Sequence, residues 1–308
     1  KLVTLKDDVP VKEELNSFIM KDVDKEKLYD FLREMEFNRL LSQAISFYGE
    51  PGHKDFEEKM AFKKNDKVNT KSYKTISNEK QLDELIKQLN EKNVIAVDTE
   101  TTSLNPQEAN LVGISISYAS NASYYIPLAH KHFKGLKKEL VLKKLKTILE
   151  DLSIKKVGQN IKYDFIIFKN NGITLNPIDD TMLLSYTLDA GNNRHNMNVL
   201  AELHLGHKTI AYKDVVGSGK KQLNFSEVDV KTATEYAGED ADVTLRLYEI
   251  LSERMTVEKL ERTYEIFEKP MVKILSKLET NGIRVDDSYL KKLSKKFEAR
   301  LIKIEKDI

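Results

Sequence analysis

Cysteine and tryptophan are both absent from this sequence of 308 residues. The lack of cysteine excludes disulfides, thiolate metal sites and cysteine nucleophiles together, and it favours a cytoplasmic setting. No apolar run approaches the roughly 20 residues that a membrane-spanning helix needs. We therefore expect no membrane association, and any chemistry must rest on oxygen and nitrogen side chains.

An excess of charge of one sign is also missing, because 50 lysines and arginines face 49 aspartates and glutamates. Proteins that bind nucleic acid through charge alone are usually more basic. The net charge of +1 therefore does not indicate a nucleic-acid partner, although a local basic surface beside an acidic site stays open. Hydrophobic residues make up 40% of the chain, which is enough for a folded core and argues against a wholly disordered protein.

The hydrophobic pattern divides the chain into three parts. In residues 1–70, apolar residues recur at helical spacing and a polar, lysine-rich stretch follows, so we expect a short helical appendage and a linker. Residues 71–256 alternate strand-like runs with amphipathic helices, which is typical of an α/β domain. Residues 257–308 are almost entirely helical. Since the sequence begins with Lys1 rather than methionine, we expect a piece of a longer protein.

The middle part predicts a central mixed sheet flanked by helices. Short apolar or alternating runs predict strands, and apolar residues at a spacing of three to four predict helices. The expected strands are 94–97, 110–118, 123–128 and 155–158. The expected helices are 78–93, 140–152, 161–170, 181–188, 198–205 and 230–254, with a polar loop over 213–225.

The first chemical signal is a pair of carboxylates at the end of a buried strand. Asp98 and Glu100 are two residues apart, and side chains at this spacing project from the same face of a strand. Two ionised carboxylates so close repel each other and need a compensating cation, for which Mg²⁺ or Mn²⁺ is suited. A lone Asp-x-Glu pair is more often a surface turn with incidental acids, so this signal is weak by itself.

Two helices supply further polar pairs at a spacing of four. Asn160 and Asp164 can share one face of the first helix, and Tyr236 and Asp240 can share one face of the second. Four acids from three elements are what a two-metal phosphodiester-cleaving site requires. We expect all four to converge on one pocket, with Asp98 and Glu100 facing both helices.

These three stretches resemble the motifs of the 3′–5′ exonuclease superfamily that uses four acids and a tyrosine. The resemblance extends to further short stretches, which are similar to bacterial DNA polymerase I, of polymerase family A, namely residues 157–160, 162–164, 180–183, 194–195, 200–202, 207–210, 236–244, 267–272 and 279–283. It implies a ribonuclease-H-like exonuclease fold with helical N- and C-terminal appendages. On this basis residues 1–70 would be the end of a 5′-nuclease domain plus a linker, and residues 257–308 the truncated start of a polymerase domain without its active site.

The resemblance also implies a role for each matched residue. Asp98, Glu100 and Asp240 would bind the tighter of two divalent ions, Mg²⁺ or Mn²⁺, with Zn²⁺ an alternative at one site. Asp164 would hold the second ion through water, and Tyr236 would orient the attacking water. Contacts with the substrate strand are implied for Leu104, which would wedge against the terminal base, for Tyr212, which would stack on it, and for Gln159, Asn160, Arg194 and Met197.

The function implied is proofreading, in which mononucleotides are removed from single-stranded or frayed DNA 3′ ends. The rest of the polymerase chain would be a partner in cis, and the setting would be the bacterial cytoplasm, at the nucleoid. Two alternatives stay open, namely an RNA 3′-end exonuclease of the same superfamily and a catalytically silent DNA-binding scaffold. Substrate preference at the 2′ position separates the first, and Mg²⁺-dependent release of mononucleotides separates the second.

Overall fold

The computed structural model describes residues 23–35, 37–48, 67–219 and 222–307. The chain forms two compact units, residues 1–63 and residues 64–308. In the first unit, helices α1 (Lys25–Glu34) and α2 (Asn38–Tyr48) cover the stretch with helical periodicity. Most of the predicted linker lies outside the described residues.

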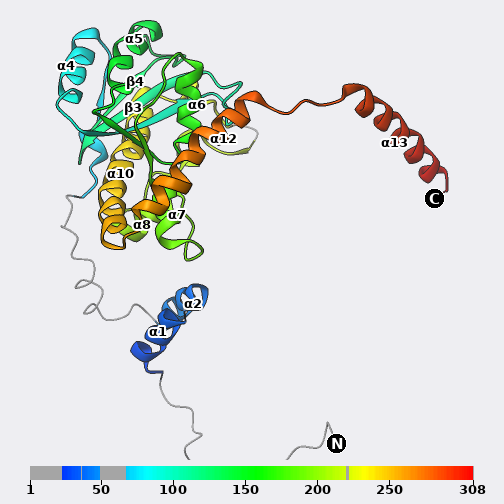
Figure 1. Ribbon diagram of the computed structural model, residues 1–308, viewed down its shortest axis with the longest axis horizontal. Helices are drawn as coiled ribbons and strands as arrows, with labels where there is room; N and C mark the ends of the chain where they lie inside the picture. The colour runs from blue at the N-terminus through cyan, green and yellow to red at the C-terminus, as the bar shows by residue number, and fades with distance from the viewer. Residues whose placement is uncertain (1–22, 36, 49–66, 220–221, 308) are drawn as a thin grey trace, which may run out of the picture. The chain divides into compact units, whose positions relative to one another are not determined.

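A six-stranded mixed sheet forms the centre of the second unit, as predicted (Figure 1). The central strand β2, which carries Asp98 and Glu100, is antiparallel to β3 and parallel to β5. The strand order is β1-β4-β3-β2-β5-β6. The strands are β1 (Lys74–Thr75), β2 (Val94–Thr101), β3 (Leu111–Ala119), β4 (Ala122–Pro127), β5 (Lys155–Gly158) and β6 (Ile178–Asp180).

Helices cover both faces of this sheet. One core contains residues of α4 (Glu79–Leu89), α5 (Lys138–Leu149) and α6 (Lys162–Asn170) packed against apolar side chains of β2, β3 and β4. The long helix α10 (Val230–Val257) packs on the opposite face. Its Ala233 and Ala237 are fully buried, and such small side chains allow a helix to approach a sheet closely.

Two of the remaining helices pack against the C-terminal half of α10. A second core joins α7 (Thr181–Asp189), α8 (Met197–Leu205) and α10. The polar stretch 213–225, expected to be a loop, contains the short helix α9 (Tyr212–Val216) and most of its remainder is irregular. The strands β1 and β6 were also not predicted, since two or three residues are too few to show a period.

The segment after α10 is helical, as its sequence predicts. It contains α11 (Glu261–Thr263), a π-helix η5 (Tyr264–Glu268), α12 (Lys269–Asn281) and α13 (Asp287–Asp307). Helix α12 packs against α6, and an ion pair joins Lys162 to Glu279. Helix α13 buries none of its residues. Among the described helices, none is both long enough and apolar enough to cross a membrane.

Candidate active site

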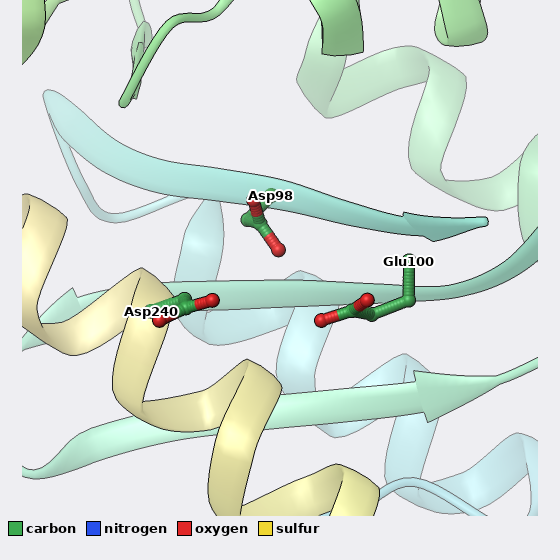
Figure 2. A group of neighbouring side chains, drawn as sticks. All are labelled: Asp98, Glu100 and Asp240. Atoms are coloured by element: carbon green, nitrogen blue, oxygen red, sulfur yellow. The ribbon is translucent and has the colours of Figure 1, made fainter. Parts of the chain in front are cut away.

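Three carboxylates meet between the central strand and α10. Asp98 and Glu100 extend from the face of β2 that α10 covers, and Asp240 extends toward them from α10 (Figure 2). One oxygen of each side chain lies within 4.8 Å of the other two. A cluster of oxygen donors this tight fits a hard divalent cation. In Mg²⁺ and Ca²⁺ sites the distance from the metal to each oxygen ligand is roughly 2.0–2.6 Å.

The electrostatics of this cluster agree with the geometry. Burial raises the pKa of Glu100 well above its ordinary value, and the charges of Asp98, Asp240 and Asp164 raise it further. Burial also raises the pKa of Asp98 to about 6, against the hydrogen bond from Ser115. The pKa of Asp240 is raised by burial and then by Asp98. The ionised cluster is therefore unfavourable unless a cation offsets its charge.

Asp164 approaches from the other layer of the fold. It lies in the first turn of α6, which packs against the face of the sheet away from α10. Its carboxylate accepts a hydrogen bond from the hydroxyl of Thr99 and is not among the three grouped acids. Helix α6 therefore packs in the layer opposite α10, although the charge of Asp98, after burial, raises the pKa of Asp164. Asp164 nevertheless lines the same cavity, because the N-terminus of α6 lies at its edge.

Tyr236 lies one turn before Asp240 on α10 and lines the cavity. Burial and the charge of Asp240 hold the pKa of its hydroxyl far above the ordinary value, so the hydroxyl stays protonated and can donate a hydrogen bond. Its ring centroid lies 6.0 Å from those of Tyr212 and Phe225. These three rings form one wall of the site.

The four acids and Tyr236 line a single cavity of about 790 Å³. Four of the predicted strand-contacting residues also line it, namely Leu104, Gln159, Asn160 and Tyr212. Leu104 is 95% exposed and Tyr212 is 43% exposed, so both can contact a ligand. The amide of Gln159 is already engaged, since it donates to the His195 carbonyl at 2.8 Å and accepts from the Thr181 hydroxyl at 2.5 Å.

Two predicted strand contacts are placed elsewhere. Arg194 is exposed but does not line the cavity. Met197 begins α8, and its side chain packs against the core formed by α7, α8 and α10. A direct role for either residue would require a substrate that extends beyond this cavity.

Two acids that neighbour Asp240 on α10 have structural partners. Glu239 accepts hydrogen bonds from His207 at 2.8 Å and from the backbone of Ile210 at 2.6 Å. Asp242 is fully buried and accepts from Tyr73 at 2.8 Å and from Arg246 at 3.1 Å. The helical spacing places both away from the carboxylate cluster, as expected for residues that neighbour Asp240 in sequence.

Sequence reasoning missed several residues that line the cavity, among them Thr99, Tyr163 and Phe225. Thr99 lies between the two predicted carboxylates, and Tyr163 precedes Asp164 within the second motif, so both were visible as neighbours of acids. The Tyr163 hydroxyl bonds to the Ser103 carbonyl at 2.5 Å and fixes the segment before Leu104. Phe225 lay in a stretch taken for a polar loop.

The sequence that forms this site matches a known protein family. Residues 73–256 match the model of a 3′–5′ exonuclease family. The chain belongs to the 3′–5′ exonuclease family. This match contains all four acids, Tyr236 and the whole cavity lining, and it begins two residues after the domain boundary expected from sequence.

The relatives of this exonuclease chain include bacterial DNA polymerases. It is 41% identical to the DNA polymerase I of Rhizobium leguminosarum over 257 residues, which cover 77% of this chain and 25% of the relative. It is 35% identical to the DNA polymerase I of Pseudomonas aeruginosa over an alignment of 312 positions, which covers 99% of this chain and 34% of the relative. The chain thus spans about a quarter to a third of these relatives and carries an exonuclease of the DNA polymerase I type.

Solved structures share the fold of this exonuclease. RNase D of Escherichia coli is 18% identical with a TM-score of 0.54, over 68% of this chain and 51% of that protein. NrnC of Brucella melitensis is 21% identical with a TM-score of 0.53, over 70% of this chain and 96% of that protein. Identities this low show the fold alone, and they confirm the predicted ribonuclease-H-like exonuclease fold.

Proposed function

We propose that this exonuclease removes nucleotides one at a time from the 3′ end of single-stranded or frayed DNA, with two divalent ions in its site. The observation that carries the proposal is the group of three carboxylates from β2 and α10, whose oxygens lie within 4.8 Å of one another. A fourth acid, Asp164, lines the same cavity. Hydrolysis of a phosphodiester with metal ions needs such a set of acids and no covalent nucleophile.

Mg²⁺ or Mn²⁺ suits these donors, with Zn²⁺ an alternative at one position. Asp98, Glu100 and Asp240 would hold one ion, and Asp98 and Asp164 the other. When bound, the ions would supply a more acidic water and would stabilise charge on the attacking and leaving oxygens. The retention of all four acids argues against a catalytically silent scaffold.

The residues of the chain itself orient the reactants. The protonated hydroxyl of Tyr236 is suited to hold the water that attacks the last phosphodiester. The oxygen of that water bonds to phosphorus, and the bond from phosphorus to the 3′ oxygen of the penultimate nucleotide breaks. That oxygen takes up a proton, and the terminal residue leaves as a deoxynucleoside 5′-monophosphate. Alignment within a few tenths of an ångström is what such a site contributes.

The strand itself would be held by stacking and backbone contacts without readout of base sequence. Leu104, which is 95% exposed at the cavity, can wedge against the terminal base. Tyr212 stacks nearly parallel to Phe225, with ring centroids 6.4 Å apart, and offers an aromatic surface to the same base. Asn160 and Gln159, which line the cavity, would contact the strand, while Arg194 and Met197 would matter only for nucleotides further along it.

The setting would be a bacterial DNA polymerase I in which this exonuclease proofreads new ends. The relatives that the chain matches carry that name and are about three to four times longer than the matched segments. We propose that the rest of the polymerase chain delivers the strand in cis, in the bacterial cytoplasm at the nucleoid.

Degradation of a 3′-labelled single strand with and without Mg²⁺ tests this function. We expect stepwise release of labelled mononucleotide from DNA that stops in excess EDTA and returns when Mg²⁺ or Mn²⁺ is added. An RNA strand of the same sequence is the matched control and should be degraded more slowly. Faster degradation of RNA would favour the 3′-end RNA exonuclease, and no release from either strand would favour the scaffold.

A further inference from the structure

The loop between β5 and α6 brings two substrate-facing residues and one acid to the site. It contains Gln159 and Asn160, which line the cavity, and it leads into the first turn of α6 with Asp164. Asn160 has a φ of 57°, in the left-handed region that residues other than glycine seldom adopt. A conformation of this kind persists only where surrounding groups hold it in place.

The side chain of Asp180 supplies that support. Its two carboxylate oxygens accept hydrogen bonds from the backbone N–H groups of Asn160 and Ile161, each at 3.0 Å. The same carboxylate caps α7 by accepting from the N–H of Met182 at 2.9 Å. Helix α6 has no capping side chain of its own, and the first N–H groups of a helix need a partner. One buried carboxylate therefore joins the starts of two helices.

Asp180 is in turn held by a segment that follows the exonuclease. The hydroxyl of Tyr264 accepts from the backbone N–H of Asp180 at 2.9 Å and donates to the carboxylate of Asp179 at 3.2 Å. Lys269 forms an ion pair with that carboxylate at 2.8 Å. Tyr264 and Asp179 are both almost fully buried, so these polar contacts are protected from water.

Tyr264 and Lys269 lie outside the match to the 3′–5′ exonuclease family, which ends at residue 256. We infer that Asp180 is a positioning residue of the exonuclease site, and that Tyr264 couples the segment after the exonuclease to that site through Asp179 and Asp180. A shift of η5 would be passed through β6 to the backbone of Asn160. The loop and the first turn of α6 would move with it.

A matched pair of tyrosine variants tests this coupling. Tyr248 also donates to Asp179, at 3.2 Å, but has no bond to Asp180. Tyr264→Phe and Tyr248→Phe therefore each remove one hydrogen bond to Asp179, and only the first also removes the acceptor of the Asp180 N–H. Because the inference rests on the proposed nuclease function only for its kinetics, the first measurement is amide hydrogen exchange, which needs no activity.

We expect exchange at Asn160 and Ile161 to rise about tenfold in Y264F and to stay near the wild-type rate in Y248F. On single-stranded DNA with Mg²⁺, well below the thermal midpoint of each protein, Y264F should raise KM or lower kcat by about three- to tenfold. Y248F should keep both constants while losing a similar amount of thermal stability. A general loss of stability would move both variants alike.

Equal exchange and equal kinetics in the two variants would overturn the coupling through Tyr264. Should Y264F fail to fold, Asp180→Asn gives the same readouts, because the amide keeps the shape but replaces one acceptor with a donor. For D180N we expect faster exchange at Asn160 and Ile161 and a loss of kcat between about tenfold and a hundredfold. Wild-type exchange at both amides in D180N would show that Asp180 does not position this loop. Absence of nuclease activity in the wild-type chain would count against the proposed function and leave the exchange result decisive for the coupling.

Discussion

The hydroxyl of Thr99 donates a hydrogen bond to the carboxylate of Asp164 across the end of the central sheet. Thr99 separates Asp98 from Glu100 on β2 and points to the side of the sheet that α6 covers. This stretch of β2 thus places Asp98 and Glu100 on one face of the sheet. On the other face, its Thr99 holds the carboxylate of Asp164. This bond also lowers the pKa of Asp164 against the larger effect of burial.

Replacing Thr99 should therefore affect the site without removing any acid. Thr99→Val keeps the shape but leaves Asp164 without its donor, so the carboxylate is more easily protonated and less well aimed. We expect kcat on single-stranded DNA to fall about tenfold in Mg²⁺. Thr99→Ser keeps the hydroxyl and should stay within about twofold of wild type; an equal loss in both variants would contradict the role of the hydroxyl.

Asp240→Ala separates chemistry from strand binding. Loss of this acid removes charge that a metal needs, while Leu104 and Tyr212 remain to hold the strand. We expect nucleotide release to fall at least about a hundredfold, whereas binding of a fluorescent single strand in Ca²⁺ stays within about threefold. Glu239→Gln is the control, since Glu239 bonds to His207 and Ile210 instead of the cluster. Release at the wild-type rate in D240A would refute the metal assignment.

Tyr236→Phe should be milder than loss of an acid. The substitution deletes one hydroxyl but spares every carboxylate and keeps the ring that lies beside Tyr212 and Phe225. We expect kcat to fall about tenfold with KM nearly unchanged, because the hydroxyl orients a water and does not bind the strand. Tyr212→Phe retains its ring as well and should leave kcat within about twofold. A rise in KM alone for Y236F would assign Tyr236 to strand binding.

Divalent ions should stabilise the fold itself. Burial and mutual repulsion raise the pKa values of Glu100 and Asp240, so the ionised cluster destabilises the metal-free protein at neutral pH. Calorimetry at pH 7.5 should show a Tm about 5–10 °C higher at a hundredfold excess of Mn²⁺ over its Kd than in EDTA. Asp240→Asn should lose most of this increase. An equal increase in D240N would place the bound ion elsewhere.

The buried ring of His130 predicts that the folded protein loses stability in acid. Burial lowers its pKa below 6.5, and its ring bonds to the Tyr125 hydroxyl at 2.7 Å and the Val228 carbonyl at 3.0 Å. Near pH 6.5 the histidine therefore binds a proton in the unfolded chain but not in the folded chain. Its contribution to the stability of the fold is present above pH 6.5 and is lost as the pH falls toward the lowered pKa.

Thermal midpoints between pH 5 and 7.5 measure this effect. His130→Gln removes the titrating ring, and we expect its Tm to fall by a few degrees less than that of the wild type over this range. Burial also lowers the pKa of His204, which acts in the same direction, so part of the slope should remain. An unchanged slope in H130Q would show that His130 does not contribute.

Local sequence patterns were enough to predict which residues could do chemistry and how residues on one helix or strand lie relative to one another. The strand period places Asp98 and Glu100 on one face, and the helix period places Tyr236 beside Asp240, because these relations depend only on local backbone geometry. The mixed sheet and its principal helices followed from the same periods. Short elements such as β6 and α9 were not predicted, since each is too short to show a clear repeat of apolar residues.

How the helices and strands meet depends instead on the three-dimensional fold. It brings Asp164 to the cavity from the opposite layer and ties it to Thr99, 65 residues away along the chain. It packs the partly buried Met197 against the second core, outside the lining of the cavity. The joining of Asp180 to Asn160 and Tyr264 was likewise invisible to periodicity. A repeat along the sequence records which face of one element is apolar, whereas contacts between elements depend on how side chains of different sizes pack in three dimensions.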